Sequence, residues 1–141
     1  MNESFDIKSI LKNVFEDIEN KSLGESISGI PVNFYDLDAM TQGLKGGDFI
    51  LLGGRPAMGK TSFSLNIARN IGLHQDLPVC IFTLNLKKEL LSYRLLSMEL
   101  GIESGRLRTG RITKEEWPLL GEAVNSLSNS PIHIIDISNI G

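Results

Sequence analysis

A glycine-rich loop between an apolar run and a helical pattern constrains this sequence more than any other feature. The loop reads Gly54-Arg-Pro-Ala-Met-Gly-Lys-Thr61. Residues 49–52 before it are wholly apolar, which predicts a strand covered on both faces. Residues 61–71 after it predict a helix that ends near Gly72. A strand, a tight loop and a helix in this order are typical of the start of a parallel α/β fold.

The spacing Gly-x-x-x-x-Gly-Lys-Thr matches the P-loop pattern in full, in the strand and helix context that the pattern requires. The alternative, a glycine turn with a coincidental Gly-Lys-Thr, is disfavoured by that context. Glycine lets the backbone approach phosphates, and the N–H groups of the loop and helix start point at the anion. We expect Lys60 to contact the β- and γ-phosphates of ATP and Thr61 to hold Mg²⁺. The predicted nucleotide-binding residues are Gly54, Arg55, Pro56, Ala57, Met58, Gly59, Lys60, Thr61 and Ser62. For Arg55, a role in binding and simple solvation remain equally open.

The N-terminal part predicts a helix set apart from the main domain. Six apolar residues recur at helical spacing on one face, namely Ile7, Ile10, Leu11, Val14, Phe15 and Ile18. We expect an amphipathic helix over residues 1–20, a linker rich in Gly, Ser and Pro over 21–33, and the main domain over 34–141.

The main domain alternates predicted strands and helices. After a turn at 43–48 and the strand–loop–helix unit come a buried strand at 77–84 and a helix at 87–100 closed by Gly101. We expect the next helix to begin at Thr113, which has capping-box spacing to Glu116; alternatively it begins at Pro118, or bends there. A third strand covers 131–137. This order predicts an α/β domain with a mostly parallel sheet. Three strands make a thin sheet, so we expect the domain to be incomplete.

Composition narrows the class of protein. The 141 residues are 41% hydrophobic and 22% charged, which is typical of a globular domain. The polar, acidic N-terminus has neither signal-peptide nor transit-peptide character. The single cysteine, Cys80, permits no internal disulfide and favours a reducing compartment, and we expect it to be buried as a small hydrophobe. The net charge of −3, without a basic stripe, shows no electrostatic footprint of nucleic-acid binding by this chain alone.

Candidates for further catalytic groups are few. Hydrolysis requires a second acidic residue for Mg²⁺ and a carboxylate that activates water. Asp136 ends an apolar strand and is one candidate for the metal; the alternative, a strand-end carboxylate facing solvent or capping a turn, is favoured. His74 and His133 have no metal-ligand spacing, and we expect structural roles for both.

Three segments of the sequence resemble a known family, and two of them lie outside the glycine-rich loop. Residues 54–68, Gly-Arg-Pro-Ala-Met-Gly-Lys-Thr-Ser-Phe-Ser-Leu-Asn-Ile-Ala, resemble the P-loop of DnaB-type replicative helicases, and so does the stretch Ser-Gly-Arg-Leu-Arg-Thr-Gly at 104–110. Residues 29–44 resemble the cyanobacterial or plastid branch. The resemblance covers residues 6–141. It implies a RecA-like ATPase domain in a hexameric ring that encircles single-stranded DNA, in the cytoplasm or the plastid stroma. It also implies that the helix at 7–18 packs on the adjacent subunit; packing on the chain's own core is the alternative.

The sequence departs from that family in two ways. Where the family has a catalytic glutamate after the second strand, this chain has Asn85, which binds water but accepts no proton. By the resemblance, we also expect the family's second metal motif, DNA-binding loops, arginine finger and primase-contacting domain to lie outside the residues of this sequence. Aligned to the family, residues 132–136 form an earlier strand, which further disfavours Asp136 as a metal ligand.

The primary interpretation is therefore the ATP-binding portion of a replicative helicase, with Lys60 and Thr61 as ligands and Asn85 at the place of the base. Three alternatives remain. One is a non-catalytic ATP-binding regulator that docks on a full-length helicase ring. Another is a decaying gene fragment. The third, a recombinase or clock-type ATPase, shares the P-loop but not residues 104–110.

Overall fold

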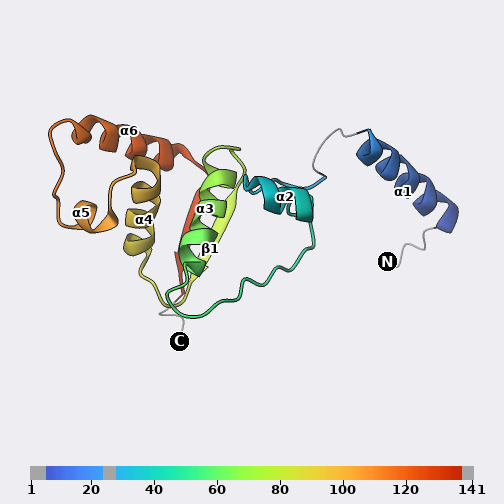
Figure 1. The fold of residues 1–141 in the computed structure, drawn as a ribbon, viewed down its shortest axis with the longest axis horizontal. Helices are drawn as coiled ribbons and strands as arrows, with labels where there is room; N and C mark the ends of the chain where they lie inside the picture. Colours follow the sequence, from blue (N-terminus) through green and yellow to red (C-terminus); the bar gives the residue numbers. More distant parts are fainter. Residues whose placement is uncertain (1–5, 24–27, 138–141) are drawn as a thin grey trace. The chain divides into compact units, whose positions relative to one another are not determined.

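The computed structural model describes residues 6–23 and 28–137, and the chain divides into two compact units, one up to Phe49 and one from Ile50 onward. The predicted domain boundary at residue 34 stays a prediction. The helices and strands are shown in Figure 1 and run, in chain order, α1 Ile7–Ser22, α2 Tyr35–Thr41, α3 Lys60–Gly72, β1 Val79–Thr83, α4 Lys88–Leu100, α5 Ser104–Arg108, α6 Glu116–Asn129 and β2 Ile132–Asp136. In the part of the chain described, no helix is long and apolar enough to cross a membrane.

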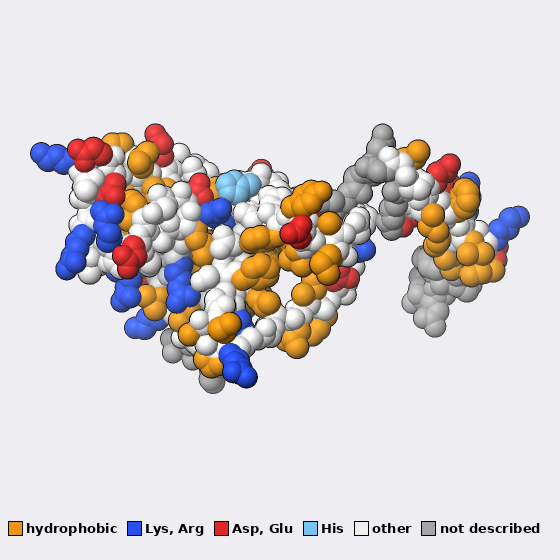
Figure 2. All heavy atoms as spheres, viewed as in Figure 1, with side chains coloured by type: hydrophobic (Ala, Val, Ile, Leu, Met, Phe, Trp, Pro, Cys, Tyr) orange, Lys and Arg blue, Asp and Glu red, His pale blue; other side chains and the backbone are white. Residues whose placement is uncertain are grey.

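In the first unit, α1 covers Ile7–Ser22 and is amphipathic, whereas the first five residues of the predicted span 1–20 lie outside the described residues. The six apolar residues of its predicted face, Ile7 to Ile18, are between 42% and 66% exposed. Figure 2 shows these hydrophobic side chains gathered along the helix. Water-exposed apolar surface costs about 25 cal/mol per Å² relative to burial, so this face is suited to a partner surface.

The rest of the first unit is organised around one buried carboxylate. Asp38 on α2 accepts hydrogen bonds from the backbone N–H groups of Val32 (2.8 Å) and Asn33 (2.9 Å). An isolated antiparallel bridge joins Ile30 to Leu44. The predicted turn at 43–48 is confirmed, with the Lys45 N–H bonded to the Asp48 carboxylate at 3.0 Å. Helix α2 was not predicted, because a seven-residue helix has too few turns for a periodic pattern.

In the second unit, β1 and β2 pair in parallel, from Val79 opposite Ile132 to Thr83 opposite Asp136. Helices α3 and α4 pack on one face of this sheet and against each other (Figure 1). The core is formed by Leu65, Leu91 and Leu95, with Ile81 and Ile134 of the strands packed against it. Each buried leucine contributes roughly 1.5–3 kcal/mol, so this cluster holds the phosphate-loop helix on the sheet.

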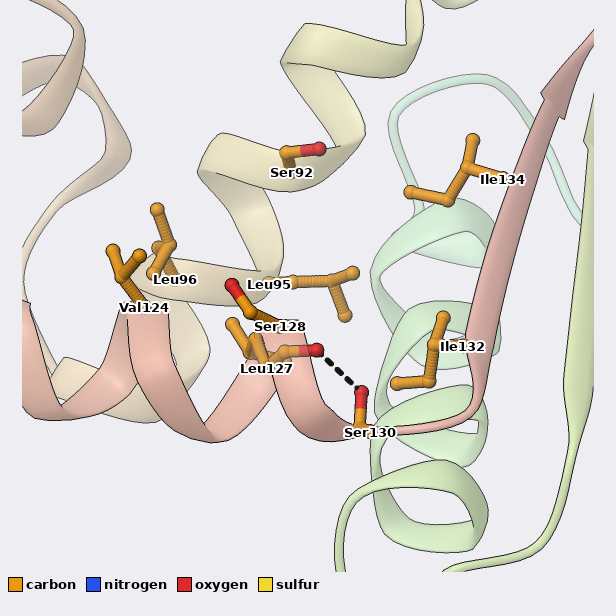
Figure 3. A pocket seen from close by; sticks show the side chains of 9 residues that line it. All are labelled: Ser92, Leu95, Leu96, Val124, Leu127, Ser128, Ser130, Ile132 and Ile134. Atoms are coloured by element: carbon orange, nitrogen blue, oxygen red, sulfur yellow. Dashed lines mark hydrogen bonds between the residues drawn. The ribbon is translucent and has the colours of Figure 1, made fainter.

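A groove of about 250 Å³ lies between α4, α6 and β2. Figure 3 shows Leu95 of α4 directed toward Ile132 and Ile134 of β2. The Ser130 hydroxyl donates to the Leu127 carbonyl at 2.7 Å and so holds the end of α6 at the start of β2. The residues that line this groove carry no charge, so it is not suited to phosphate.

The predicted strand at 49–52 is wrong. Within the described residues the sheet has two strands, not three, and residues 49–52 pair with neither of them. Phe49 is 91% exposed and Leu51 83%. An apolar run becomes a strand only when a neighbour supplies backbone hydrogen bonds, and local sequence does not say whether one is present.

The expected burial of Cys80 is also wrong, because Cys80 is exposed. Alternate residues of a strand point to opposite faces of the sheet. The face toward α3 and α4 is partly or fully buried, whereas the opposite face, with Cys80 and Phe82 of β1 and His133 and Ile135 of β2, is exposed. Both strands are therefore half-buried rather than buried on both faces.

Helix α6 starts at Glu116, between the two predicted positions, and the predicted Thr113–Glu116 hydrogen bonds are present at this start. The Thr113 N–H donates to the Glu116 carboxylate at 2.9 Å, and the Glu116 N–H donates to the Thr113 hydroxyl at 3.3 Å. Pro118 falls in the first turn of α6, where a backbone N–H has no intrahelical partner to lose. The short helix α5, Ser104–Arg108, was not predicted.

Candidate functional site

The loop before α3 has the backbone shape that an anion site needs. Ala57 and Gly59 adopt positive φ angles of 61° and 88°. Gly59 is the residue that directly precedes α3, and only glycine takes this left-handed conformation without a steric cost. Alternation of left- and right-handed residues turns successive N–H groups toward one side.

These N–H groups are available to a ligand. No side-chain hydrogen bond caps the start of α3. Within the described residues, the backbone N–H groups of residues 57–62 donate to no backbone carbonyl. The first four N–H groups of a helix have no intrahelical partner and carry partial positive charge, so they favour a phosphate.

The Lys60 ammonium lies over the loop. Its Nζ donates to the carbonyl oxygens of Gly54 (2.7 Å) and Arg55 (3.0 Å). The aliphatic part of Lys60 passes close to Gly54, since an added Cβ there would lie 3.4 Å from Lys60 Cγ, an ordinary van der Waals contact. Neutral carbonyls hold a cation less strongly than a phosphate does, so Lys60 is poised to exchange them for an anion.

A cavity of about 360 Å³ adjoins the loop and brings three of the predicted residues together. Lys60 and Thr61 of α3 line it, and so does Asn85 from the loop after β1. The other lining residues are Leu52, Ser64, Leu65, Ile81, Phe82, Thr83, Leu84, Leu86 and Leu91. Lys60 is the one charged residue in this set. The predicted residues 55–59 and Ser62 are exposed and do not line the cavity, and neither does Asp136.

Thr83 also lines the cavity and was not among the predicted site residues. Thr83 is buried at the end of β1, and its hydroxyl donates to the Leu86 carbonyl at 2.8 Å while accepting from the Leu86 N–H at 3.2 Å. The signal in the sequence was a hydroxyl residue at a predicted strand end, since Ser and Thr side chains close turns through nearby backbone groups.

The residues suit a nucleoside triphosphate, and the charge of the site is positive. The described residues contain no group of three His, Cys, Asp or Glu side chains placed to hold a metal ion. His74 and His133 are both exposed. Thr61 places a hydroxyl group on the lining of the cavity beside Lys60.

A second charged cluster lies outside the cavity, before α6. Arg106 donates from Nη1 and Nη2 to the two carboxylate oxygens of Glu116, at 3.0 and 2.8 Å, and from Nη2 to the Arg111 carbonyl at 3.0 Å. The hydrogen bonds from Arg106 and from the Thr113 N–H hold the pKa of Glu116 below its usual range. The same side-chain hydrogen bond raises the pKa of Arg106. Arg106 and Glu116 pair with each other, so this cluster does not offer an unpaired cation to an anionic ligand.

Known proteins match both the sequence and the fold. Residues 29–141 match the family described as "DnaB-like helicase C terminal domain". The "Replicative DNA helicase DnaB" of Nostoc sp. is 48% identical over 134 residues, which are 95% of this chain and 15% of that protein. This chain thus spans a small part of that relative.

Two solved structures have folds similar to that of this chain. One, the structure of an ATPase domain, superposes with a TM-score of 0.86 and 34% identity over 96% of this chain and 48% of that one. A DnaB-like replicative helicase, solved in a study of its interactions with primase, gives 0.81 and 34% over 96% of this chain and 32% of that one. The expected RecA-like α/β fold is confirmed, with a small parallel sheet. The chain belongs to the family of DnaB-like helicase C-terminal domains.

Proposed function

We propose that this chain is the ATP-binding portion of a replicative DNA helicase, whose complete protein unwinds duplex DNA at the replication fork. The observation that carries the proposal is the loop 54–61, with its uncapped helix start and Lys60 held on carbonyls, in a chain of this family. Cytoplasm or plastid stroma is the proposed location, in keeping with the cyanobacterial relative.

Binding follows from the chain's own groups. The N–H groups of the loop and of the first turn of α3 would receive the phosphate oxygens, and Lys60 would leave the Gly54 and Arg55 carbonyls for the β- and γ-phosphates. Thr61 would hold Mg²⁺ through its hydroxyl. When bound, Mg²⁺ neutralises phosphate charge. Pro56, Met58 and Ser62 would supply the loop's backbone shape rather than side-chain contacts, and Arg55 is exposed beside them.

The step from binding to hydrolysis is where a second function enters. Asn85 lines the cavity at the place where the family resemblance puts a catalytic glutamate, and no described lining residue is acidic. An amide orients water but accepts no proton, which removes general-base assistance worth roughly 10²–10⁴-fold. This observation favours a non-catalytic ATP-binding subunit or regulator as the second candidate. In either case we propose helicase activity for the complete protein and not for this chain alone.

The partner proposed for α1 is a helicase subunit, either another copy of this chain or a full-length protein of the ring. The support is the exposed apolar face from Ile7 to Ile18. Single-stranded DNA would be bound by the complete ring. Phe15→Glu places a charge on this face and should abolish association with a purified full-length DnaB in analytical ultracentrifugation. Lys12→Glu, on the opposite face, should leave it intact; equal behaviour of the two variants would contradict the proposal.

The test of the nucleotide site is equilibrium binding of ATP with Mg²⁺ to the purified chain and to Lys60→Ala, with turnover measured in parallel. Binding that depends on Lys60 is expected. The absence of binding to the wild-type chain would sink the proposal. Turnover that depends on Lys60 would favour the enzyme portion, whereas binding without turnover would favour the non-catalytic subunit.

A further inference from the structure

We infer that Asn85, held in place by the hydroxyl of Thr83, makes this site select nucleoside triphosphates over diphosphates. Asn85 would donate a hydrogen bond to the terminal phosphate, and Thr83 would act as the positioning residue. The inference rests on the proposed nucleotide-binding function and adds a discriminating contact to it.

The loop that carries Asn85 is fixed at both ends. At its start, the Thr83 carbonyl accepts from the Ile137 N–H at 2.9 Å, which ties the end of β1 to the segment after β2. At its end, Leu86 packs against the core of Leu65, Leu91 and Leu95. The Thr83 hydroxyl bonds to both the carbonyl and the N–H of Leu86, so two hydrogen bonds close the four-residue turn.

This turn places the Asn85 side chain at the cavity, where it can bind a ligand. Asn85 is exposed, and its amide has no hydrogen-bond partner among the described residues. It lines the same cavity as Lys60 and Thr61, the two residues expected at the outer phosphates and their metal. A triphosphate reaches further along these residues than a diphosphate, so the additional phosphate is the one that Asn85 would contact.

The chemistry of the amide explains why an asparagine suits this role. Its NH₂ group donates two hydrogen bonds, whereas a carboxylate of the same shape accepts only. Lys60 is the one charge on the cavity lining, so the site is positive and a neutral donor keeps it so. A carboxylate at residue 85 would instead meet the negative terminal phosphate as a like charge.

The experiment compares affinities for a non-hydrolysable ATP analogue and for ADP, both with Mg²⁺, across a set of variants of the full chain. A hydrogen bond to a charged group is worth about 1.5–3 kcal/mol. Asn85→Ala should therefore lower the ratio of the two affinities at least about tenfold. Asn85→Asp, which has the same shape, should lower it further. Asn125→Ala on α6, away from the cavity, is the matched control and should leave the ratio unchanged.

Thr83 is tested by two variants. Thr83→Val keeps the shape but loses the hydroxyl, and should lower the ratio in the same direction as Asn85→Ala. Thr83→Ser keeps the hydroxyl and should retain the wild-type ratio. The inference is overturned if Asn85→Ala weakens both nucleotides equally or neither, or if Thr83→Val leaves the ratio intact. Failure of the wild-type chain to bind either nucleotide would instead reject the proposed function itself.

Discussion

The starts of α3 and α6 in the second unit solve the same physical problem in opposite ways. Each helix begins with backbone N–H groups that lack intrahelical partners. Before α6, Thr113 and Glu116 satisfy each other's N–H groups. Before α3, Gly59 offers no side chain, and the N–H groups of residues 57–62 have no backbone partner among the described residues. One start is closed by its own sequence, and the other is left open for a ligand.

The cations beside the two helix starts differ in the same sense. Arg106 makes a two-pronged ion pair with Glu116, which is a charge-assisted arrangement with fixed geometry. Lys60 rests on two neutral carbonyls of its own loop. An incoming phosphate competes with carbonyls for Lys60 but with a carboxylate for Arg106. In this chain, a basic side chain near a helix start therefore indicates an anion site only where it does not already form an ion pair with a carboxylate of the chain.

The largest expected effect is on ligand-induced stabilisation. At ATP concentrations of 100 times the dissociation constant, a bound nucleotide should stabilise the wild-type chain by about 2.7 kcal/mol. Lys60→Ala removes charged hydrogen bonds worth about 2–3 kcal/mol, so its affinity should fall about a hundredfold and the stabilisation should nearly vanish. Thermal denaturation with and without ATP measures this stabilisation.

Arg106→Ala, the matched control, should lower the stability of the chain yet keep the full increment from ATP. Loss of the increment in both variants would erase the distinction between the two helix starts.

A smaller effect is expected from Gly59→Ala. An added Cβ meets no atom within 4 Å, so any change comes from the backbone, whose φ of 88° costs an alanine about 1–2 kcal/mol. Affinity for ATP should fall about tenfold or less as the loop relaxes away from this shape. Gly121→Ala on α6 also meets open space, but in a helical backbone, and should stabilise the chain by about 0.5–1 kcal/mol without changing affinity. Isothermal calorimetry and denaturation midpoints measure the two effects. Unchanged affinity in Gly59→Ala would mean that the loop shape does not matter for binding.

Both helix starts were predicted to within a few residues, because a short local pattern determines each of them. Gly59-Lys60-Thr61 places the first turn of α3, and the Thr113–Glu116 spacing places that of α6. Residues 49–52 and Cys80 were predicted wrongly, because burial of an apolar strand depends on which distant segments cover it. Thr83 was missed for a related reason. Its importance lies in the turn that it closes beside Lys60, and that proximity arises only when β1 and α3 pack together.

The smallest expected effect is the pH dependence of the closed helix start. The pKa of Glu116 is lowered in the folded chain, chiefly by its hydrogen bond with Arg106 and then by the Thr113 N–H. A lowered pKa means that the ionised carboxylate stabilises the fold above its unfolded pKa of about 4.3, and that this contribution is lost as the pH falls through the lower folded value. The denaturation midpoint of the wild-type chain should therefore exceed that of Glu116→Gln by a constant amount between about pH 5 and 7, and the difference should shrink below about pH 4.

The other carboxylates titrate in both proteins and cancel in this difference. Because the pair is partly exposed, added salt should also reduce it. A difference that stays constant down to the acid transition would show that the ionised pair contributes nothing, and that Thr113 alone closes the start of α6.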